Sequence, residues 1–303
     1  MMEYRLVERT CPVCDSNNAL VIGIRGNREY TGADPQATPH IVTNVVRCNT
    51  CDMIYTNPEI RGLEHLEAAH YNDSDNYMKE LGAGIYQMFD TRIRLIKKYT
   101  HAGQPDLLDI GAGKGEFLQV AARAGFQVTG VEPSAGFCEY ARTRLGVNMQ
   151  QGLLGEVGAI RGHRFDVVTM NHVLEHVEQP VDLLRLIQEY MADSGILFIE
   201  VPNCDSYLAR LADLFFRIKG LRWSSRLSPL HPPFHKFGHT KKSLRYLLQS
   251  CGYNVVTCKT FSGKDRSSFV QKGWKYKAAA AFSDLFNLVG NRELLCVVAE
   301  KAK

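Results

Sequence analysis

The sequence contains no apolar run long enough to cross a membrane as a helix. Its longest apolar stretches, near residues 196–199 and 294–299, have the length of a strand and fall far short of the ~20 residues that a span requires. The start of the chain carries two acids and no apolar segment, so it does not resemble a secretory signal. No internal repeat or low-complexity tract is present. We therefore expect a cytoplasmic protein, in which 45% hydrophobic residues over 303 positions can bury a large core.

The sequence also lacks a strong excess of charge, since a formal net charge of +4 is low for a dedicated nucleic-acid binder. The nine cysteines are an odd number, and four of them form two C-x-x-C pairs. In a reducing compartment such pairs favour metal ligation over disulfides.

The two cysteine pairs are Cys11 with Cys14 and Cys48 with Cys51. Each pair places two thiolates on a tight knuckle, and two knuckles complete the tetrahedron of a structural Zn²⁺ with no open position. The 33 residues between the pairs exceed the usual spacing of about 15–20, but they contain two strand-like runs, 19–24 and 40–47, around a turn region. The pattern predicts a zinc ribbon over residues 1–58 with an elongated hairpin.

Residues 107–117 read as an apolar strand that turns sharply into a helix. The strand carries Asp109, and the glycines that follow at 111, 113 and 115 are each two residues apart. A dinucleotide fingerprint needs the spacing G-x-G-x-x-G, so this turn disfavours a pyrophosphate ligand. A second strand, 127–131, ends in Glu132, which follows Gly111 by 21 residues and is placed to accept the hydroxyls of a ribose. The two strand ends together fit one adenosine-containing ligand.

These residues resemble the class I S-adenosylmethionine-dependent methyltransferases, whose first motif reads acid-x-Gly-x-Gly-x-Gly and whose second strand ends in the ribose-binding acid. Residues 165–180, with Leu-Glu-His-Val at 174–177, resemble the fourth strand and following segment of the ubiquinone-biosynthesis-type and sugar methyltransferase branch. Residues 195–203 resemble the fifth strand of that branch, and 47–58 resemble the second knuckle that precedes the catalytic domain in some members. The likeness extends over roughly residues 85–300.

Strand-like and helix-like segments alternate from residue 107 onward, which predicts an α/β fold with a parallel sheet covered on both faces. The resemblance implies a Rossmann-like seven-stranded methyltransferase sheet over 105–303, with an insert at 204–250. The strand at 293–300 would then lie antiparallel between the fifth strand and the strand at 253–260. Residues 59–104 have helical spacing and are expected to form a linker that caps the cofactor site.

The resemblance also assigns the cofactor residues. It places Asp109, Gly111 and Gly113 along the methionine part of S-adenosylmethionine, with Ala112 in the same turn, and it places Glu132 on the ribose. Three further positions complete the predicted cofactor site: Leu153, Asn171 and His172. Leu153 stands where many members carry an acid that contacts the adenine, whereas Asn171 and His172 should line the floor beside the sulfonium.

Histidine is the usual side chain for accepting a proton near neutral pH, and three histidines are candidates for the general base: His235, His176 and His239. His235 is preferred because its segment resembles the one that lies over the acceptor pocket in the family. For His176 a structural hydrogen bond is the alternative role. A metal site formed by His235, His239 and His231 is a further alternative, although Pro232 and Pro233 interrupt the helix that it needs.

Residues 206–226 form an amphipathic and basic insert, with five cations against a single acid. It is either a solvated lid or a surface for anionic groups, such as nucleotide-sugar phosphates or a membrane. The leading functional hypothesis is O-methylation of a small molecule, either neutral or anionic, such as a sugar or nucleotide-linked sugar. One alternative is an rRNA or tRNA methyltransferase that binds RNA through its zinc ribbon. Residues 11–58 contain no lysine, which argues against RNA binding there. The other is a cofactor-binding protein without catalysis, and the oligomeric state stays open.

Overall fold

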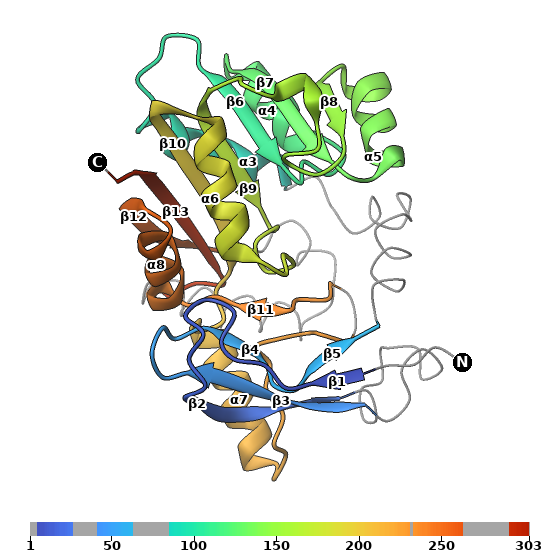
Figure 1. Cartoon of the computed structure of the whole chain (residues 1–303), viewed down its shortest axis with the longest axis vertical. Helices are drawn as coiled ribbons and strands as arrows, with labels where there is room; N and C mark the ends of the chain where they lie inside the picture. The colour runs from blue at the N-terminus through green and yellow to red at the C-terminus, as the bar shows by residue number, and fades with distance from the viewer. Residues whose placement is uncertain (1–4, 27–40, 63–84, 231–232, 263–290, 303) are drawn as a thin grey trace, which may run out of the picture.

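The computed structural model describes residues 5–26, 41–62, 85–230, 233–262 and 291–302. A seven-stranded sheet with helices on both faces occupies one part of the molecule, and smaller sheets built largely from the N-terminal residues occupy the other (Figure 1). None of the described helices combines the length and apolarity that crossing a membrane requires.

The large sheet has the strand order β12-β13-β10-β9-β6-β7-β8. Its strands are β6 (Asp106–Ile110), β7 (Gln127–Glu132), β8 (Asn148–Gln151), β9 (Phe165–Asn171), β10 (Met191–Pro202), β12 (Tyr253–Phe261) and β13 (Leu294–Lys301). Strands β6, β7, β8, β9 and β10 run parallel, while β13 lies antiparallel between β10 and β12. This confirms the predicted sheet, including the place of its last strand.

Alternating side chains of the central strands build two cores, one on each face of the sheet. Leu108 and Val168 pack with helices α6 (Pro180–Tyr190) and α8 (Lys241–Ser250), whereas Leu107 and Val167 pack with α3 (Ile85–Lys97) and α4 (Glu116–Arg123). The remaining helical segments are α5 (Ala135–Tyr140), a π turn (Ala141–Leu145), a 3-10 turn (Gly158–Ile160) and α7 (Tyr207–Ile218). Side-chain N-caps begin α5, α7 and α8, and Pro180 fits the first turn of α6, where no amide donor is needed.

The N-terminal part contains two antiparallel sheets. One has the order β11-β4-β3-β2 and the other pairs β1 with β5. The strands are β1 (Arg5–Val7), β2 (Ala19–Gly26), β3 (Val42–Cys48), β4 (Ile54–Thr56), β5 (Glu59–Arg61) and β11 (Phe237–Gly238). The predicted hairpin is present as β2 and β3. Residues 59–61, for which helical spacing was predicted, form a strand instead because they pair with β1.

The two parts are joined through the insert that follows β10. Its strand β11 pairs with β4, so residues from the insert complete the ribbon sheet. Thr240, the N-cap of α8, donates to Asp52 Oδ2 at 2.6 Å, next to the second cysteine knuckle. Arg25 Nε donates to the carbonyl of Leu227 at 2.6 Å. Residues of the ribbon, such as Tyr55, share one apolar core with α8, so the N-terminal part packs directly on the larger one.

Candidate functional site

The turn after β6 is held open by two glycines with left-handed backbone. Gly111 has φ +65°, and a Cβ there would lie 2.5 Å from Cγ2 of Val173. Gly113 has φ +54°, and a Cβ there would meet no atom within 4 Å, so this side of the turn faces open space. The amides of Gly111 and Ala112 both donate to the carbonyl of Val131, which ties the turn to β7. Such a turn lets a ligand approach the backbone closely.

Asp109 lies beneath this turn with only 2% of its surface exposed. Its Oδ1 accepts hydrogen bonds from Thr169 Oγ1 at 2.6 Å and from Asn171 Nδ2 at 3.2 Å. Burial raises the pKa of Asp109 to about 7, and these hydrogen bonds oppose the rise. The strands β6 and β9 therefore bring Asp109 and Asn171 together, two of the predicted cofactor residues.

Glu132 ends β7 beside the same turn. Its Oε2 accepts from the amide of Gly113 at 3.0 Å and its Oε1 from the amide of Ser134 at 2.9 Å. Burial raises the pKa of its carboxyl, against these two hydrogen bonds. Leu153 follows the next strand, β8, and is 55% exposed. The Glu132 carboxylate therefore lies beside Gly113, at the strand ends where we expect the ribose.

His172 bridges two buried carboxylates that the sequence did not single out. Its Nδ1 lies 3.3 Å from Glu175 Oε1 and its Nε2 lies 3.3 Å from Glu200 Oε1. The backbone of His172 has φ +56°, and its amide donates to the carbonyl of Glu200 at 2.9 Å. The two carboxylate side chains are 1% and 4% exposed, while the histidine is 42% exposed. The imidazole is thus partly accessible, although both of its nitrogens face carboxylates.

The opposite charges of His172, Glu175 and Glu200 stabilise one another. Burial opposes the charge on His172, but the hydrogen bonds and charges of Glu175 and Glu200 outweigh it and raise its pKa to about 10. Burial would raise the pKa of Glu175, yet the hydrogen bond and charge of His172 lower it to about 2. The pKa of Glu200 is likewise lowered to about 2, with Arg92 adding to the effect of His172. At neutral pH the site holds a cationic imidazole between two carboxylates.

Arg92, from α3, contacts the oxygen of Glu200 that His172 does not use. Its Nε donates to Glu200 Oε2, and both side chains are nearly fully buried. The thiol of Cys296 donates to the same oxygen at 2.9 Å. The predicted capping segment therefore contributes a buried ion pair to the end of β10, which fixes Glu200 and leaves its Oε1 to His172.

His235 and His176 lie together over Glu175. Their ring centroids are 5.1 Å apart, and His235 Nε2 is 3.8 Å from Glu175 Oε1. The amides of Lys236 and Phe237 donate to the carbonyl of Glu175, so the backbone holds the His235 segment in place. Each of the three side chains offers an atom within 4.8 Å of the others, close enough to surround one cation.

His239 differs from the other two candidates, because it is fully buried and burial lowers its pKa to about 4. Burial also lowers the pKa of His176. His231 lies outside the described residues, so the metal site formed by His231, His235 and His239 stays a prediction. The structure brings His176 and His235 together on one carboxylate and places His239 in the core beyond them.

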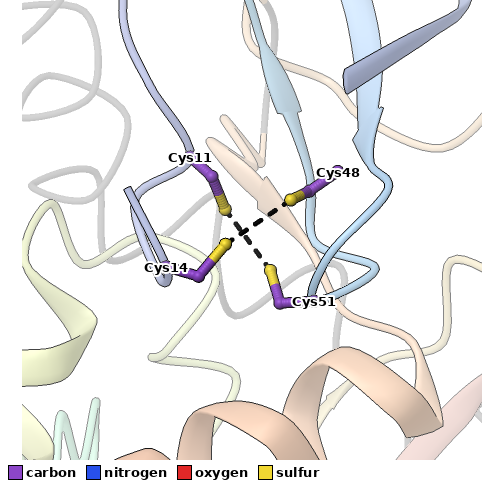
Figure 2. A group of neighbouring side chains, drawn as sticks. All are labelled: Cys11, Cys14, Cys48 and Cys51. Carbon is purple, nitrogen blue, oxygen red and sulfur yellow. Dashed lines mark hydrogen bonds between the residues drawn. The ribbon is translucent and has the colours of Figure 1, made fainter. Parts of the chain in front are cut away.

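The four cysteine sulfurs of the N-terminal part converge on one point (Figure 2). Sγ of Cys11 lies 3.4 Å from Sγ of Cys51, and Sγ of Cys14 lies 3.5 Å from Sγ of Cys48. All four sulfurs fall within 4.8 Å of one another. Tetrahedral zinc with bonds of about 2.3 Å needs sulfurs about 3.8 Å apart, so this donor set fits the ion.

Comparison with known proteins agrees with this geometry. Residues 78–258, more than half of the chain, match a methyltransferase-domain family. Over 124 residues the chain is 28% identical to the ubiquinone biosynthesis O-methyltransferase of Nitrosospira multiformis, covering 39% of this chain and 52% of that protein. Over 111 residues it is 37% identical to the mitochondrial enzyme of the same name from Schizosaccharomyces pombe, covering 35% and 40%. The chain thus spans about half the length of the curated relatives it matches.

Solved structures show the same fold at low identity. A SAM-dependent methyltransferase from Archaeoglobus fulgidus is 20% identical with a TM-score of 0.50, covering 71% of this chain and 94% of its own. A SAM-dependent methyltransferase from Thermotoga maritima is 16% identical with a TM-score of 0.52, covering 76% and 98%. The chain therefore belongs to the methyltransferase-domain family and has the fold of the class I S-adenosylmethionine-dependent methyltransferases.

Proposed function

We propose that this protein transfers the methyl group of S-adenosylmethionine to a hydroxyl oxygen of a small molecule. The observation that carries the proposal is the meeting of the Gly111–Gly113 turn and the Glu132 carboxylate at adjacent strand ends, beside the His172, Glu175 and His235 group. The ubiquinone biosynthesis O-methyltransferases among its relatives support an oxygen acceptor.

The cofactor supplies an electrophilic methyl group when it is bound. The residues present fit it, because Gly113 borders open space and Glu132 offers carboxylate oxygens at the same edge. Glu132 would accept the hydroxyls of the ribose, and Asp109 with Asn171 would support the turn beneath the methionine part. These contacts would orient the donor for in-line attack by an acceptor.

His235 is the proposed general base, with His176 as its neighbour. A hydroxyl must lose its proton as its oxygen bonds to carbon, and His235 Nε2 can take that proton while Glu175 stabilises the resulting imidazolium from 3.8 Å. Glu175 is suited to this role because His172 keeps its pKa low and the carboxylate ionised. His239 is enclosed in the core, which favours the other two histidines for contact with an acceptor.

The acceptor and the metal are also part of the proposal. A sugar or nucleotide-linked sugar is one acceptor class, and a precursor in ubiquinone biosynthesis is the class that the relatives' names suggest. The four-cysteine centre would hold one structural Zn²⁺. Its role would be to stabilise the ribbon. Strand β4 of the ribbon pairs with β11, which directly follows the segment that contains His235.

Product analysis tests the function directly. The protein is incubated with cofactor labelled in its methyl group and with separate pools of nucleotide sugars, quinone precursors and rRNA, and products are identified by mass spectrometry. A labelled small molecule is expected, and the Glu132→Gln variant should form much less of it. Label in rRNA alone would replace this proposal with the RNA alternative. Cofactor binding by calorimetry without any labelled product would instead indicate the non-catalytic one.

A further inference from the structure

Helix α7 is fixed to the rest of the protein along one side. Asp213 is buried on that side, where its carboxylate accepts from the amide of Ser225 and from Arg226 Nε, each at 2.7 Å. Phe216 contacts the ring of Trp223 with centroids 6.5 Å apart, and Trp223 bridges to Ile24 of β2. The helix is therefore held in one orientation beside the ribbon sheet (Figure 1).

The opposite side of α7 is apolar and exposed. Four large side chains on it are exposed by 44% to 75%: Leu208, Leu214, Phe215 and Ile218. At 100° per residue these positions are centred about 180° from Asp213 and Phe216, so they form one stripe that points away from the protein body. Leu221, just beyond the helix, continues it with 40% exposure. A helix packed on a core normally turns its apolar stripe toward that core, whereas α7 turns its apolar stripe toward solvent.

Cations flank the apolar stripe. The exposed Arg217, Lys219 and Arg222 make no salt bridge with any described residue, whereas Arg210 pairs with Asp205 at 2.5 Å. The acid within the helix, Asp213, is buried against Arg226 and does not reduce the positive charge of the exposed side. A solvent-facing apolar stripe between basic residues is the pattern of a helix that lies in a membrane interface.

We propose that α7 docks this protein peripherally on a membrane containing anionic phospholipids. Leu214, Phe215 and Ile218 would enter the boundary between headgroups and acyl chains, and the flanking cations would contact lipid phosphates. A second copy of this chain fits the stripe less well, because pairing two α7 helices would bring the unpaired cations of both copies into one interface, and the helix has no exposed acid to offset them. This membrane contact does not depend on which acceptor is methylated.

Docking would also orient the candidate active site. The segment from Asn203 to Ser206 joins α7 to the end of β10, close to Glu200 and His172. Arg226 stabilises this connecting segment, since its Nη1 donates to the carbonyl of Cys204 at 2.8 Å and to Asp205 Oδ1 at 3.1 Å. A membrane that holds α7 therefore lies at a fixed position relative to the site, and not at the end of a flexible linker.

Vesicle co-sedimentation of the full chain tests the surface. Wild type should bind vesicles of equimolar phosphatidylcholine and phosphatidylglycerol, bind phosphatidylcholine vesicles much less, and be released by salt. The double variant Phe215→Ser, Ile218→Ser should lower the partition coefficient by at least about tenfold, because both side chains leave the lipid. The triple variant Arg217→Gln, Lys219→Gln, Arg222→Gln should remove the preference for anionic vesicles.

A charge-matched control separates the surface from net charge. Lys98, Arg123 and Arg144 are exposed cations on other elements, and replacing all three with Gln should leave vesicle binding near wild type. Unchanged circular dichroism of every variant shows that the fold is retained. Failure of wild type to bind either vesicle overturns the proposal. So does a dimer in light scattering that the Phe215, Ile218 variant converts to monomer, because the stripe would then be a self-interface.

Discussion

Replacing His172 with Gln should destabilise the protein in a way that depends on pH. The substitution removes the cation between Glu175 and Glu200 and leaves a polar side chain of similar size. Glu200 retains Arg92 and Cys296, whereas Glu175 keeps the longer contact to His235 at 3.8 Å and the neighbouring His176. Removing one partner of a buried ion pair costs about 3–5 kcal/mol, because a buried charge remains unpaired. Since His172 is 42% exposed, we expect about 3 kcal/mol.

The sign of the pH dependence follows from the two shifted groups. The pKa of His172 is raised from 6.5 to about 10, so its contribution to folding is complete below pH 6.5 and is lost as the pH rises toward 10. The pKa of Glu175 is lowered from 4.5 to about 2, so its contribution is complete above pH 4.5 and is lost as the pH falls toward 2. The difference between wild type and variant should therefore be greatest between pH 4.5 and 6.5 and should shrink on both sides.

Urea unfolding followed by circular dichroism at a series of pH values measures this difference. The control is His163→Gln, since His163 pairs with Asp106 at 3.2 Å but both side chains are well exposed, at 50% and 34%. A surface pair of this kind contributes about 0–1 kcal/mol, so the control should stay close to wild type. A destabilisation by His172→Gln that is equal at about pH 5.5 and about pH 9 would refute the linked charges.

Three further predictions concern the cofactor, the metal and the base. Glu132→Gln should weaken cofactor binding by about 1.5–3 kcal/mol in calorimetry, because the ribose hydroxyls lose a charged acceptor. Protein purified without chelator should contain one zinc per chain by elemental analysis, and Cys48→Ser should lose the zinc and, through β4 and β11, most of the activity. His235→Ala should lower kcat by ~10²–10⁴-fold while cofactor affinity stays near wild type.

Each of these has an outcome that contradicts it. Unchanged affinity in Glu132→Gln would remove that residue from the site. A wild-type protein without zinc, whose four thiols react freely, would refute the zinc ribbon. Full turnover of His235→Ala across the neutral range would transfer the role to His176 or indicate an acceptor that needs no base.

The sequence was most informative where the signal is local. Asp109 and the glycines after β6 predicted a strand that turns into a helix, and the turn forms there because Gly111 and Gly113 adopt positive φ that other residues rarely reach. The seven-stranded sheet and the antiparallel place of its last strand were implied by the family resemblance and are confirmed. The meeting of the four cysteines followed from their spacing, since two tight knuckles need only one hairpin to bring them together.

The parts that the sequence did not predict depend on contacts between distant segments. Glu200 looked like an ordinary strand residue, and only the pairing of β10 with β9 and the position of Arg92 on α3 make it a partner of His172. Glu175 was visible within Leu-Glu-His-Val, but its burial beneath His235 depends on residues about 60 positions apart. Neither periodicity nor motif spacing encodes such a meeting.

Strand β11 shows most clearly how the N-terminal part and the methyltransferase domain are joined. It pairs with β4 of the ribbon through Phe237, while the amide of the same residue donates to the carbonyl of Glu175. Thr240 then begins α8 with a hydrogen bond to Asp52, which lies next to Cys51 in the second knuckle. A shift of that knuckle must move β11, and with it His235, relative to Glu175. These contacts link the cysteine centre to the segment that carries His235, in agreement with the structural role that we propose for the metal.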